Sequence, residues 1–407
     1  MVQVVFVHPD LGIGGAERLV VDAALALRRK GHDVQFFTAH HDPGHCFPET
    51  RDGQLEVTCI GDWLPRSTFG MLAAFWAYIR MIYVSLYLVM FSGIKYDVVF
   101  VDQVSACIPF LRMKGGTKII FYCHFPDQLL TERKSFLKKV YRYILDTLEE
   151  KTTSQADCVL VNSHFTASVY KETFKSIKTS PSVLYPSLDF DNFDKYSSLT
   201  LKDVDLDLDS ECIFLSLNRY ERKKNVSLAL QSMKLLLDIL NKDEIARVHL
   251  VIAGGYDDRV QENIEHYREL YTLATRLGIL EKITFLKSPS DKVKFALLRF
   301  AKCLLYTPDK EHFGIVPLEA MYVGTPVIAV NSGGPTETIV SEETGFLCEP
   351  NPEDFAKAMQ KFVTGINDKD SMGEAGHSRV VSNFSFIKFS EHLNYIVQGL
   401  IDERKLK

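Results

Sequence analysis

The sequence lacks several features that would assign it to a common class of protein. Its 47 Lys and Arg residues are outnumbered by 52 Asp and Glu residues, so it has no basic excess and we expect no binding to nucleic acid. The eight cysteines form no C-x-x-C pair and the histidines form no cluster at zinc spacing, which favours reduced thiols in a cytosolic compartment. The first segment, Met1–Val7, has no charged start and no long apolar core. We therefore expect a first strand there, and not a signal peptide.

Strand-like and helix-like segments alternate along two stretches of the chain, which is long enough for two cores. This alternation predicts an α/β fold of two doubly wound, Rossmann-like domains that face a cleft. We expect domains at 1–190 and 211–385, an Asp-rich linker at 191–210, and a last helix at 386–407 that can pack back on the first domain. The expected strands are 2–7, 34–39, 55–60, 97–101, 118–122, 158–161, 183–185, 212–217, 247–253, 283–286, 303–306, 327–330 and 346–348. The expected helices are 16–30, 69–91, 104–111, 132–155, 163–175, 226–240, 258–277, 290–300, 315–323, 352–364 and about 386–404.

One segment, Phe69–Phe91, is apolar over a length that can span a bilayer, with Arg80 as its one charged residue. It lies between the expected strands 55–60 and 97–101, which must stay on one side of a membrane in order to pair. We therefore predict a helix that lies in the cytosolic leaflet without crossing it, because its Trp and Tyr residues suit a membrane interface. A core helix that carries one arginine is the alternative.

The most informative stretch runs from Glu311 to Glu319. Pro317 suits the first turn of a helix, so we expect Glu311 on the entering loop and Glu319 about two turns along. The backbone N–H groups of Gly314 and Ile315 at the helix start favour a phosphate. Because the segment follows an expected strand, its loop lies where α/β sheets bind ligands. The pair indicates a site for a phosphate-linked sugar, with two carboxylates on a solvated helix face as the alternative.

Two features of the first domain lie at the carboxyl ends of expected strands. Gly14 and Gly15 open a helix after the first strand, as in a phosphate-binding turn, although a simple tight turn explains the same glycines. His124 follows the fifth strand, and Pro126 restricts its loop. It is therefore a candidate for the same ligand-binding edge, with a structural histidine as the alternative.

A cationic loop follows the first strand of the second domain. It contains Arg219, Arg222, Lys223 and Lys224 within one turn. The planar fork of arginine and the point charge of lysine suit a diphosphate, whereas a solvated loop is the alternative. Together with the two glutamates, this loop predicts that the second domain binds a nucleotide diphosphate sugar.

The E-x7-E pattern resembles that of the retaining glycosyltransferases of GT-B fold, and the resemblance covers essentially the whole chain. A closer resemblance is to the alpha-1,3/1,6-mannosyltransferase family of the asparagine-linked glycosylation pathway. The strings that carry it are Val7–Gly12, Gly14–Leu19, Asp42–Phe47, Asp102–Pro109, Phe121–Asp127, Asn218–Asn225 and Glu311–Met321.

This resemblance implies a reaction. The donor is GDP-mannose, the acceptor is a dolichyl-diphosphate-linked oligosaccharide, and an alpha-1,3 and then an alpha-1,6 mannose are added with retention of configuration. It implies the cytosolic face of the endoplasmic reticulum membrane and no bound catalytic metal or other cofactor. Other enzymes of the pathway are candidate partners.

The resemblance also implies roles for the residues. Glu311 contacts the donor sugar and Glu319 the ribose, while Arg219 and Lys224 bind the diphosphate. Lys223 is the alternative to Lys224. Lys224 is favoured because Asn225 follows it, as a Lys-Asn pair. No nucleophile is evident, so front-face attack assisted by the leaving diphosphate is the expected mechanism. The candidate catalytic residues are His124, Glu311, Arg219 and Lys224, and the candidate substrate-binding residues are Gly14, Gly15, Arg219, Lys224, Gly314, Ile315 and Glu319.

Two alternatives remain beside this interpretation. One is another retaining GT-B transferase with a different sugar or acceptor. The other is a non-catalytic, membrane-bound subunit that binds the nucleotide sugar. The intact set of candidate residues argues against the second.

Overall fold

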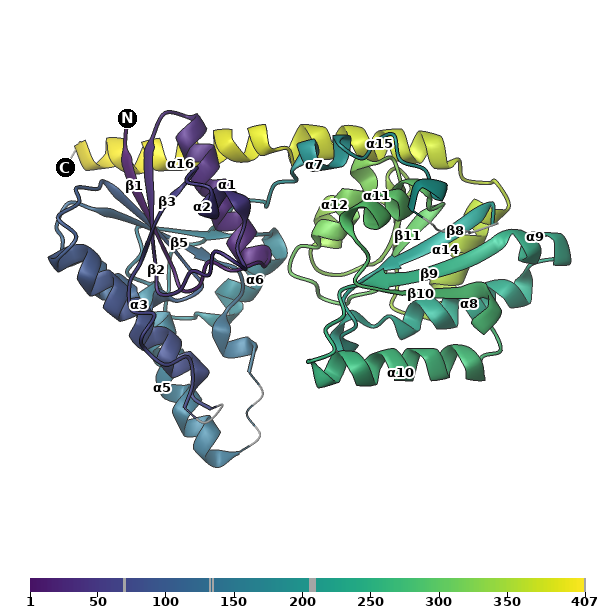
Figure 1. Cartoon of the computed structure of the whole chain (residues 1–407), viewed down its shortest axis with the longest axis horizontal. Coiled ribbons are helices and arrows are strands. Elements are labelled where there is room, and N and C mark those ends of the chain that lie inside the picture. The colour runs from purple at the N-terminus through teal and green to yellow at the C-terminus, as the bar shows by residue number, and fades with distance from the viewer. Residues whose placement is uncertain (69–70, 132, 134, 205–209, 406–407) are drawn as a thin grey trace. The chain divides into compact units, whose positions relative to one another are not determined.

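The structure is a computed structural model of the whole chain (Figure 1). The chain divides into two units. Unit 1 contains residues 1–187 and 386–407, and unit 2 contains residues 188–385. Each unit holds one parallel sheet with helices around it, which confirms the α/β class. The described residues are 1–68, 71–131, 133, 135–204 and 210–405.

The sheet of unit 1 has seven parallel strands in the order β3-β2-β1-β4-β5-β6-β7. Its strands are β1 (Gln3–His8), β2 (Asp33–Thr38), β3 (Glu56–Cys59), β4 (Val98–Asp102), β5 (Lys118–Cys123), β6 (Cys158–Val161) and β7 (Ser182–Val183). Its helices are α1 (Gly15–Arg29), α2 (Pro48–Arg51), α3 (Ala73–Met90), η1 (Ser105–Cys107), α4 (Ile108–Leu111), η2 (Asp127–Leu129), α5 (Phe136–Thr153), α6 (His164–Thr173) and α16 (Phe386–Lys405).

The alternation of side chains along β1 builds two cores. Val4 and Phe6 lie in one core with buried residues of α1 and α16. Val5 and Val7 lie in the other with buried residues of α3 and α5. Because both faces are covered, the strands read as continuous apolar runs.

The sheet of unit 2 has six parallel strands in the order β10-β9-β8-β11-β12-β13. Its strands are β8 (Cys212–Leu217), β9 (Val248–Gly254), β10 (Ile283–Lys287), β11 (Cys303–Tyr306), β12 (Val327–Val330) and β13 (Gly345–Cys348). Its helices are α7 (Phe190–Asp194), η3 (Lys202–Val204), η4 (Arg222–Lys224), α8 (Ser227–Ile239), α9 (Lys242–Arg247), α10 (Gln261–Arg276), η5 (Leu280–Lys282), α11 (Asp291–Phe300), α12 (Ile315–Tyr322), α13 (Pro335–Thr338), α14 (Pro352–Val363) and α15 (Lys369–Asn383).

Helix α3 covers most of the apolar segment 69–91, of which residues 69 and 70 lie outside the described part. Within the described residues it is the one helix long and apolar enough to cross a membrane, with a mean hydropathy of 1.5 and 33% of it buried. Its buried face includes Met81 and Val84, which pack on the sheet. Arg80 is also buried, and its Nη2 donates to the carbonyl of Ala39 at 2.9 Å. One face of α3 is thus core, and contact of its other face with lipid stays a prediction.

Candidate active site

The loop after β8 is held against β9 by close backbone contact. The amide of Asn218 donates to the carbonyl of Ala253 at 3.0 Å. Gly254 has a φ of +154°, and a Cβ there would lie 1.8 Å from the carbonyl oxygen of Asn218. A glycine is therefore required, because any side chain would displace the cationic loop.

Lys224 and Glu311 form an ion pair that joins the loops after β8 and β11. Lys224 Nζ donates to Glu311 Oε2, and both side chains are largely buried. Thr307 Oγ1 donates to the carbonyl of Lys224 at 2.8 Å, which ties the same loops together. Burial raises the pKa of Glu311, but the charge of Lys224 outweighs burial and lowers it. The pair therefore presents an ionised carboxylate beside an ammonium group.

Glu319 lies one turn into α12, nearer to the start of the helix than the two turns expected from the sequence. The N-cap is Gly314 with φ of +85°, so the first N–H groups of the helix have no side-chain cap. Glu319 Oε1 accepts from Lys294 Nζ at 2.7 Å. Burial raises the pKa of Glu319, and Lys294 offsets only part of this rise. Its buried Oε2 has no hydrogen-bond partner among the described residues, and this favours a ligand hydroxyl as the missing donor.

The other cations of the loop lie elsewhere. Arg219 Nη1 lies 2.8 Å from Glu221 Oε1, and Lys223 Nζ lies 3.1 Å from Glu221 Oε2. Arg222 pairs instead with α10, at 2.6 Å from Glu269. The lysine that forms the ion pair with Glu311 is thus Lys224 and not Lys223. Arg219 stays 61% exposed and, among the described residues, forms an ion pair with Glu221 and not with Glu311, so its position allows it to meet a ligand from solvent.

The glycine-rich turn after β12 supports the loop that carries Glu311. The amide of Gly334 donates to the carbonyl of Glu311 at 2.8 Å, and the amide of Lys310 donates to Ser332 Oγ at 2.9 Å. A Cβ at Gly334 would lie 2.1 Å from the carbonyl oxygen of Phe313. Two turns that are distant in the sequence therefore fix one carboxylate.

In unit 1, Gly14 and Gly15 lie at the start of α1, as expected. Gly14 is the N-cap in an extended conformation, and a Cβ there would lie 2.2 Å from Glu17 Oε2. A Cβ at Gly15 would meet no atom within 4 Å. The absence of a side chain at Gly14 therefore lets Glu17 fold back over the helix start.

His124 belongs to a buried chain of polar groups at the carboxyl ends of β1, β4 and β5. Its Nε2 lies 3.2 Å from Asp102 Oδ2, and His8 Nδ1 lies 2.6 Å from Asp102 Oδ1. On the far side of His8, Nε2 lies 3.6 Å from Glu17 Oε1. Asp102 and His8 are buried, whereas the side chain of His124 remains 24% exposed. The two inner groups, His8 and Asp102, are thus closed to a ligand, whereas His124 at the end of the series is partly open.

The charges of the buried polar groups around Asp102 affect one another's pKa values. Burial lowers the pKa of His8, but Asp102 and Glu17 outweigh it and raise the pKa to about 10. Burial raises the pKa of Asp102, but the two imidazoles outweigh it and lower that pKa. A cationic His8 and an ionised Asp102 follow at neutral pH, and Asp102 favours the His124 tautomer with its proton on Nε2.

His8, Asp102 and Lys294 are not among the site residues that the sequence predicts. His8 and Asp102 each end a buried parallel strand, which is the signal that pointed to His124. Lys294 has no local signal, because a single lysine on a surface helix is common.

Two family matches agree with this arrangement. Residues 13–192 match the family Glycosyltransferase Family 4, and residues 202–379 match the family Glycosyl transferases group 1. The sucrose-phosphate synthase from Thermosynechococcus elongatus has a similar fold, with a TM-score of 0.76 at 20% identity over 99% of this chain and 100% of that one. The two parallel sheets, the family matches and the strand-end site define a glycosyltransferase of GT-B fold.

Relatives narrow the class. The chain is 53% identical over 403 residues to the Alpha-1,3/1,6-mannosyltransferase ALG2 of Homo sapiens, which covers 98% of this chain and 96% of the relative. It is 46% identical over 415 residues to the protein of the same name in Dictyostelium discoideum, which covers 98% of each. The chain belongs to the ALG2 family of alpha-1,3/1,6-mannosyltransferases.

Proposed function

We propose that the protein transfers mannose from GDP-mannose to a dolichyl-diphosphate-linked oligosaccharide, first in alpha-1,3 and then in alpha-1,6 linkage. This reaction adds two sugars to the precursor of N-linked glycans. Relatives named alpha-1,3/1,6-mannosyltransferase are similar to this chain over nearly their whole length, which supports both linkages.

The single observation that carries the donor site is the ion pair of Lys224 with Glu311, which lies on the loop that leads into the helix α12 of Glu319. Lys224 supplies a cation for the diphosphate next to Glu311, which contacts the mannose. The free Oε2 of Glu319 accepts from a ribose hydroxyl. The N–H groups of Gly314 and Ile315 face the phosphates from the start of α12.

Catalysis in this proposal rests on the stabilisation of a leaving group. As the bond between mannose and GDP breaks, negative charge develops on the diphosphate, and Lys224 and Arg219 stabilise it. Glu311 stabilises positive charge that develops on the sugar ring. The acceptor hydroxyl attacks from the same face as the departing diphosphate, which retains the configuration. From unit 1, His124 contacts the reacting sugar, and Gly15 leaves room for a phosphate group, whereas the Glu17 carboxylate occupies the space beside Gly14.

The proposal includes a place and partners. The acceptor is anchored in lipid, so the enzyme works at a membrane, and the likeness to the ALG2 relatives implies the cytosolic face of the endoplasmic reticulum. No bound metal and no further cofactor take part. Other enzymes of the same assembly pathway are the proposed protein partners.

The decisive experiment is incubation with GDP-mannose and synthetic lipid-linked acceptors that carry one or two mannoses. We expect the first acceptor to gain an alpha-1,3 mannose and the second an alpha-1,6 mannose, identified by linkage-specific mannosidases. UDP-glucose and UDP-N-acetylglucosamine serve as control donors. Transfer from a control donor, or products with other linkages, would contradict the proposal.

A further inference from the structure

Helix α5 has its polar and apolar faces reversed relative to an ordinary surface helix. The face that packs against unit 1 includes Arg142, Asp146 and Glu149, all of which are buried. An amphipathic helix of a globular protein normally buries its apolar face. The exposed face of α5, which we call the α5 surface, is formed by Phe136, Leu137, Val140, Tyr143, Ile144 and Leu148.

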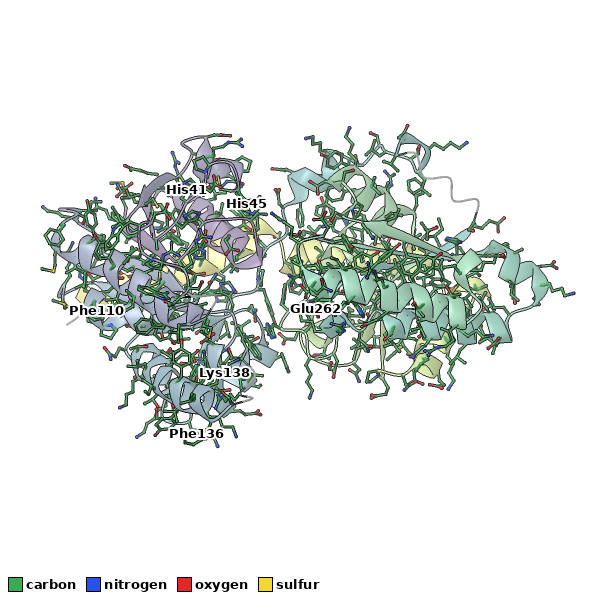
Figure 2. The ribbon with its side chains drawn as sticks, turned by 60° about the horizontal axis from the view of Figure 1, so that its bottom comes forward. His41, His45, Phe110, Phe136, Lys138 and Glu262 are labelled. Atoms are coloured by element: carbon green, nitrogen blue, oxygen red, sulfur yellow. The ribbon has the colours of Figure 1, made fainter. Side chains whose placement is uncertain are left out.

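The spacing of the α5 surface is that of a continuous helical stripe. Its members recur at intervals of one, three or four positions over more than three turns, so their side chains share one side of the helix. Phe136 is 78% exposed, Leu137 is 80% exposed and Tyr143 is 72% exposed. Figure 2 shows Phe136 and Lys138 at the outer edge of unit 1. An exposed apolar stripe of this length marks a surface that is covered in the working protein.

The buried polar face of α5 holds the segment that follows His124. The two carboxylate oxygens of Glu149 accept from the amides of Asp127 and Gln128, at 2.7 and 3.1 Å. Arg142 Nη2 donates to Asp127 Oδ2 at 2.8 Å. One helix therefore connects an exposed apolar surface to the loop of a candidate catalytic residue.

Charge indicates what covers the surface. Lys138 and Lys139 lie in the first turn of α5, are exposed, and have no carboxylate partner among the described residues. The first acidic residue of the helix is Asp146. Two cations in the first turn are unfavourable for the isolated helix, because the N-terminal end of the helix dipole is positive. Their presence therefore indicates an interaction with a negatively charged group outside the protein. Anionic lipid headgroups are such a group, because basic residues beside an inserted apolar face attract them.

The start of α3 lies next to the α5 surface. The amide of Phe75 in α3 donates to the hydroxyl of Tyr141 in α5 at 3.0 Å. Met71, Leu72 and Phe75 are exposed apolar residues at this end of α3, and Figure 1 shows both helices at the same edge of unit 1. The apolar area therefore extends beyond one helix, as a bilayer contact requires.

We propose that the α5 surface inserts into the headgroup region of a bilayer that contains anionic phospholipids. Its link to the proposed function is the lipid-linked acceptor, which must be reached at that bilayer. Docking through α5 places the segment after His124 at the membrane where such an acceptor is found. Helix α3 then contributes its first turn, while its buried face stays on the sheet.

The test is flotation of the full-length protein with vesicles of phosphatidylcholine, with and without phosphatidylinositol. Leu137→Asp combined with Ile144→Asp should weaken binding by about tenfold or more, since two apolar side chains leave the interface. Ile366→Asp combined with Ile387→Asp makes the same chemical change at exposed residues outside α5 and should bind as the wild type does. Lys138→Gln and Lys139→Gln should each weaken binding about fivefold, and only to the anionic vesicles.

Activity separates this proposal from the proposed function. The α5 variants should transfer mannose normally to a short-chain, water-soluble acceptor, and more slowly to a dolichyl acceptor in vesicles. Leu137→Asn combined with Ile144→Asn provides a milder change if the aspartate variant unfolds. If the wild type does not bind vesicles, or if the α5 variants float unchanged, the α5 surface is not a membrane contact. If the wild type is a dimer that the α5 variants convert to a monomer without a change in flotation, a second copy covers the surface and the proposal is wrong. If the protein floats as expected but transfers no mannose to either acceptor, the proposed function fails and the membrane surface stands.

Discussion

Asp102 offers a sharp test of the polar chain in unit 1, because one buried carboxylate lies between two imidazoles. Asp102→Asn keeps the size and shape of the side chain and removes its charge. The variant leaves His8 and His124 without the charged group that lies 2.6 Å and 3.2 Å from them in the wild type. We expect a loss of both stability and turnover.

The magnitude follows from the charge on His8. Burial lowers the pKa of His8, but Asp102 and Glu17 raise it from 6.5 to about 10. This interval corresponds to roughly 5 kcal/mol in favour of the charged form, at about 1.36 kcal/mol per pH unit. Removal of one partner from a buried ion pair costs about 3–5 kcal/mol. We therefore expect Asp102→Asn to lower the free energy of unfolding at pH 7 by about 3–5 kcal/mol.

The pH dependence has a defined sign. The pKa of His8 is higher in the folded state than in the unfolded state, so its stabilisation is complete below pH 6.5 and is lost as the pH rises through about 10. The stability difference between wild type and Asp102→Asn should shrink over that interval in urea unfolding experiments. Asp97→Asn is a matched control just before the opposite end of β4, where the carboxylate pairs with Arg404 and not with a histidine. Its stability difference from wild type should not show this decline.

Turnover provides the second measurement. Without the Asp102 carboxylate, the His124 tautomer that carries its proton on Nε2 is no longer favoured, so kcat should fall. The affinity for GDP should change little, because Lys224, Arg219 and Glu319, which are proposed to bind the nucleotide diphosphate, lie in unit 2. If Asp102→Asn has wild-type stability at every pH and an unchanged kcat, the buried polar groups around Asp102 contribute neither to stability nor to turnover.

Three further predictions concern other charged groups. Arg219→Ala should weaken GDP-mannose binding by about 1.5–3 kcal/mol in calorimetry, while Lys223→Ala, equally exposed and bonded to the same glutamate, should bind almost normally; equal losses would contradict the choice of cation. Glu311→Gln should reduce kcat more than GDP affinity and Glu319→Gln should do the reverse, so one shared pattern in both variants would refute the division of roles. Burial raises the pKa of Glu149 from 4.5 to about 7, so its contribution to stability is most favourable below pH 4.5 and falls by up to about 3 kcal/mol as the pH rises to 7; Glu149→Gln should remove that slope in thermal unfolding.

The strands could be predicted from the sequence because their cause is local. Cys158–Val161, Cys212–Leu217, Cys303–Tyr306 and Val327–Val330 have the bounds expected for them. Each is a short apolar run between turn residues and is buried on both faces of a parallel sheet. Burial of this kind leaves a signal in every residue of the run.

Helix α15 could not be predicted because its cause is tertiary. Gly373 and Gly376 interrupt a helical pattern, and glycine lowers helix propensity. In the structure these glycines form a packing face. A Cβ at Gly373 would lie 2.1 Å from the carbonyl of Gly324, and one at Gly376 would lie 3.2 Å from the Cβ of Met321. Close approach to α12 therefore outweighs propensity, and no local pattern records it.

Some residues of the candidate site could likewise be predicted from the sequence, whereas their pairings could not. Glu311, Lys224 and His124 could be proposed because each follows a strand within a few residues. The pairings of Glu319 with Lys294 and of His124 with Asp102 could not, because each joins elements whose spacing in the chain has no periodic signature. The helix α5 was expected at 132–155 and found at Phe136–Thr153, but which of its faces is buried depends on Glu149 and its amide partners.

The position of α16 has a consequence for synthesis of the chain. Leu393 and Val397 complete the core that α1 begins, and His32 Nε2 lies 2.7 Å from Asn394 Oδ1. Unit 1 therefore consists of the first and last parts of the chain, with all of unit 2 between them. While the ribosome makes unit 2, α16 does not yet exist, so the apolar side of α1 is exposed and can bind chaperones. A stop codon just before residue 386 would thus leave unit 2 intact and harm the unit that was translated first.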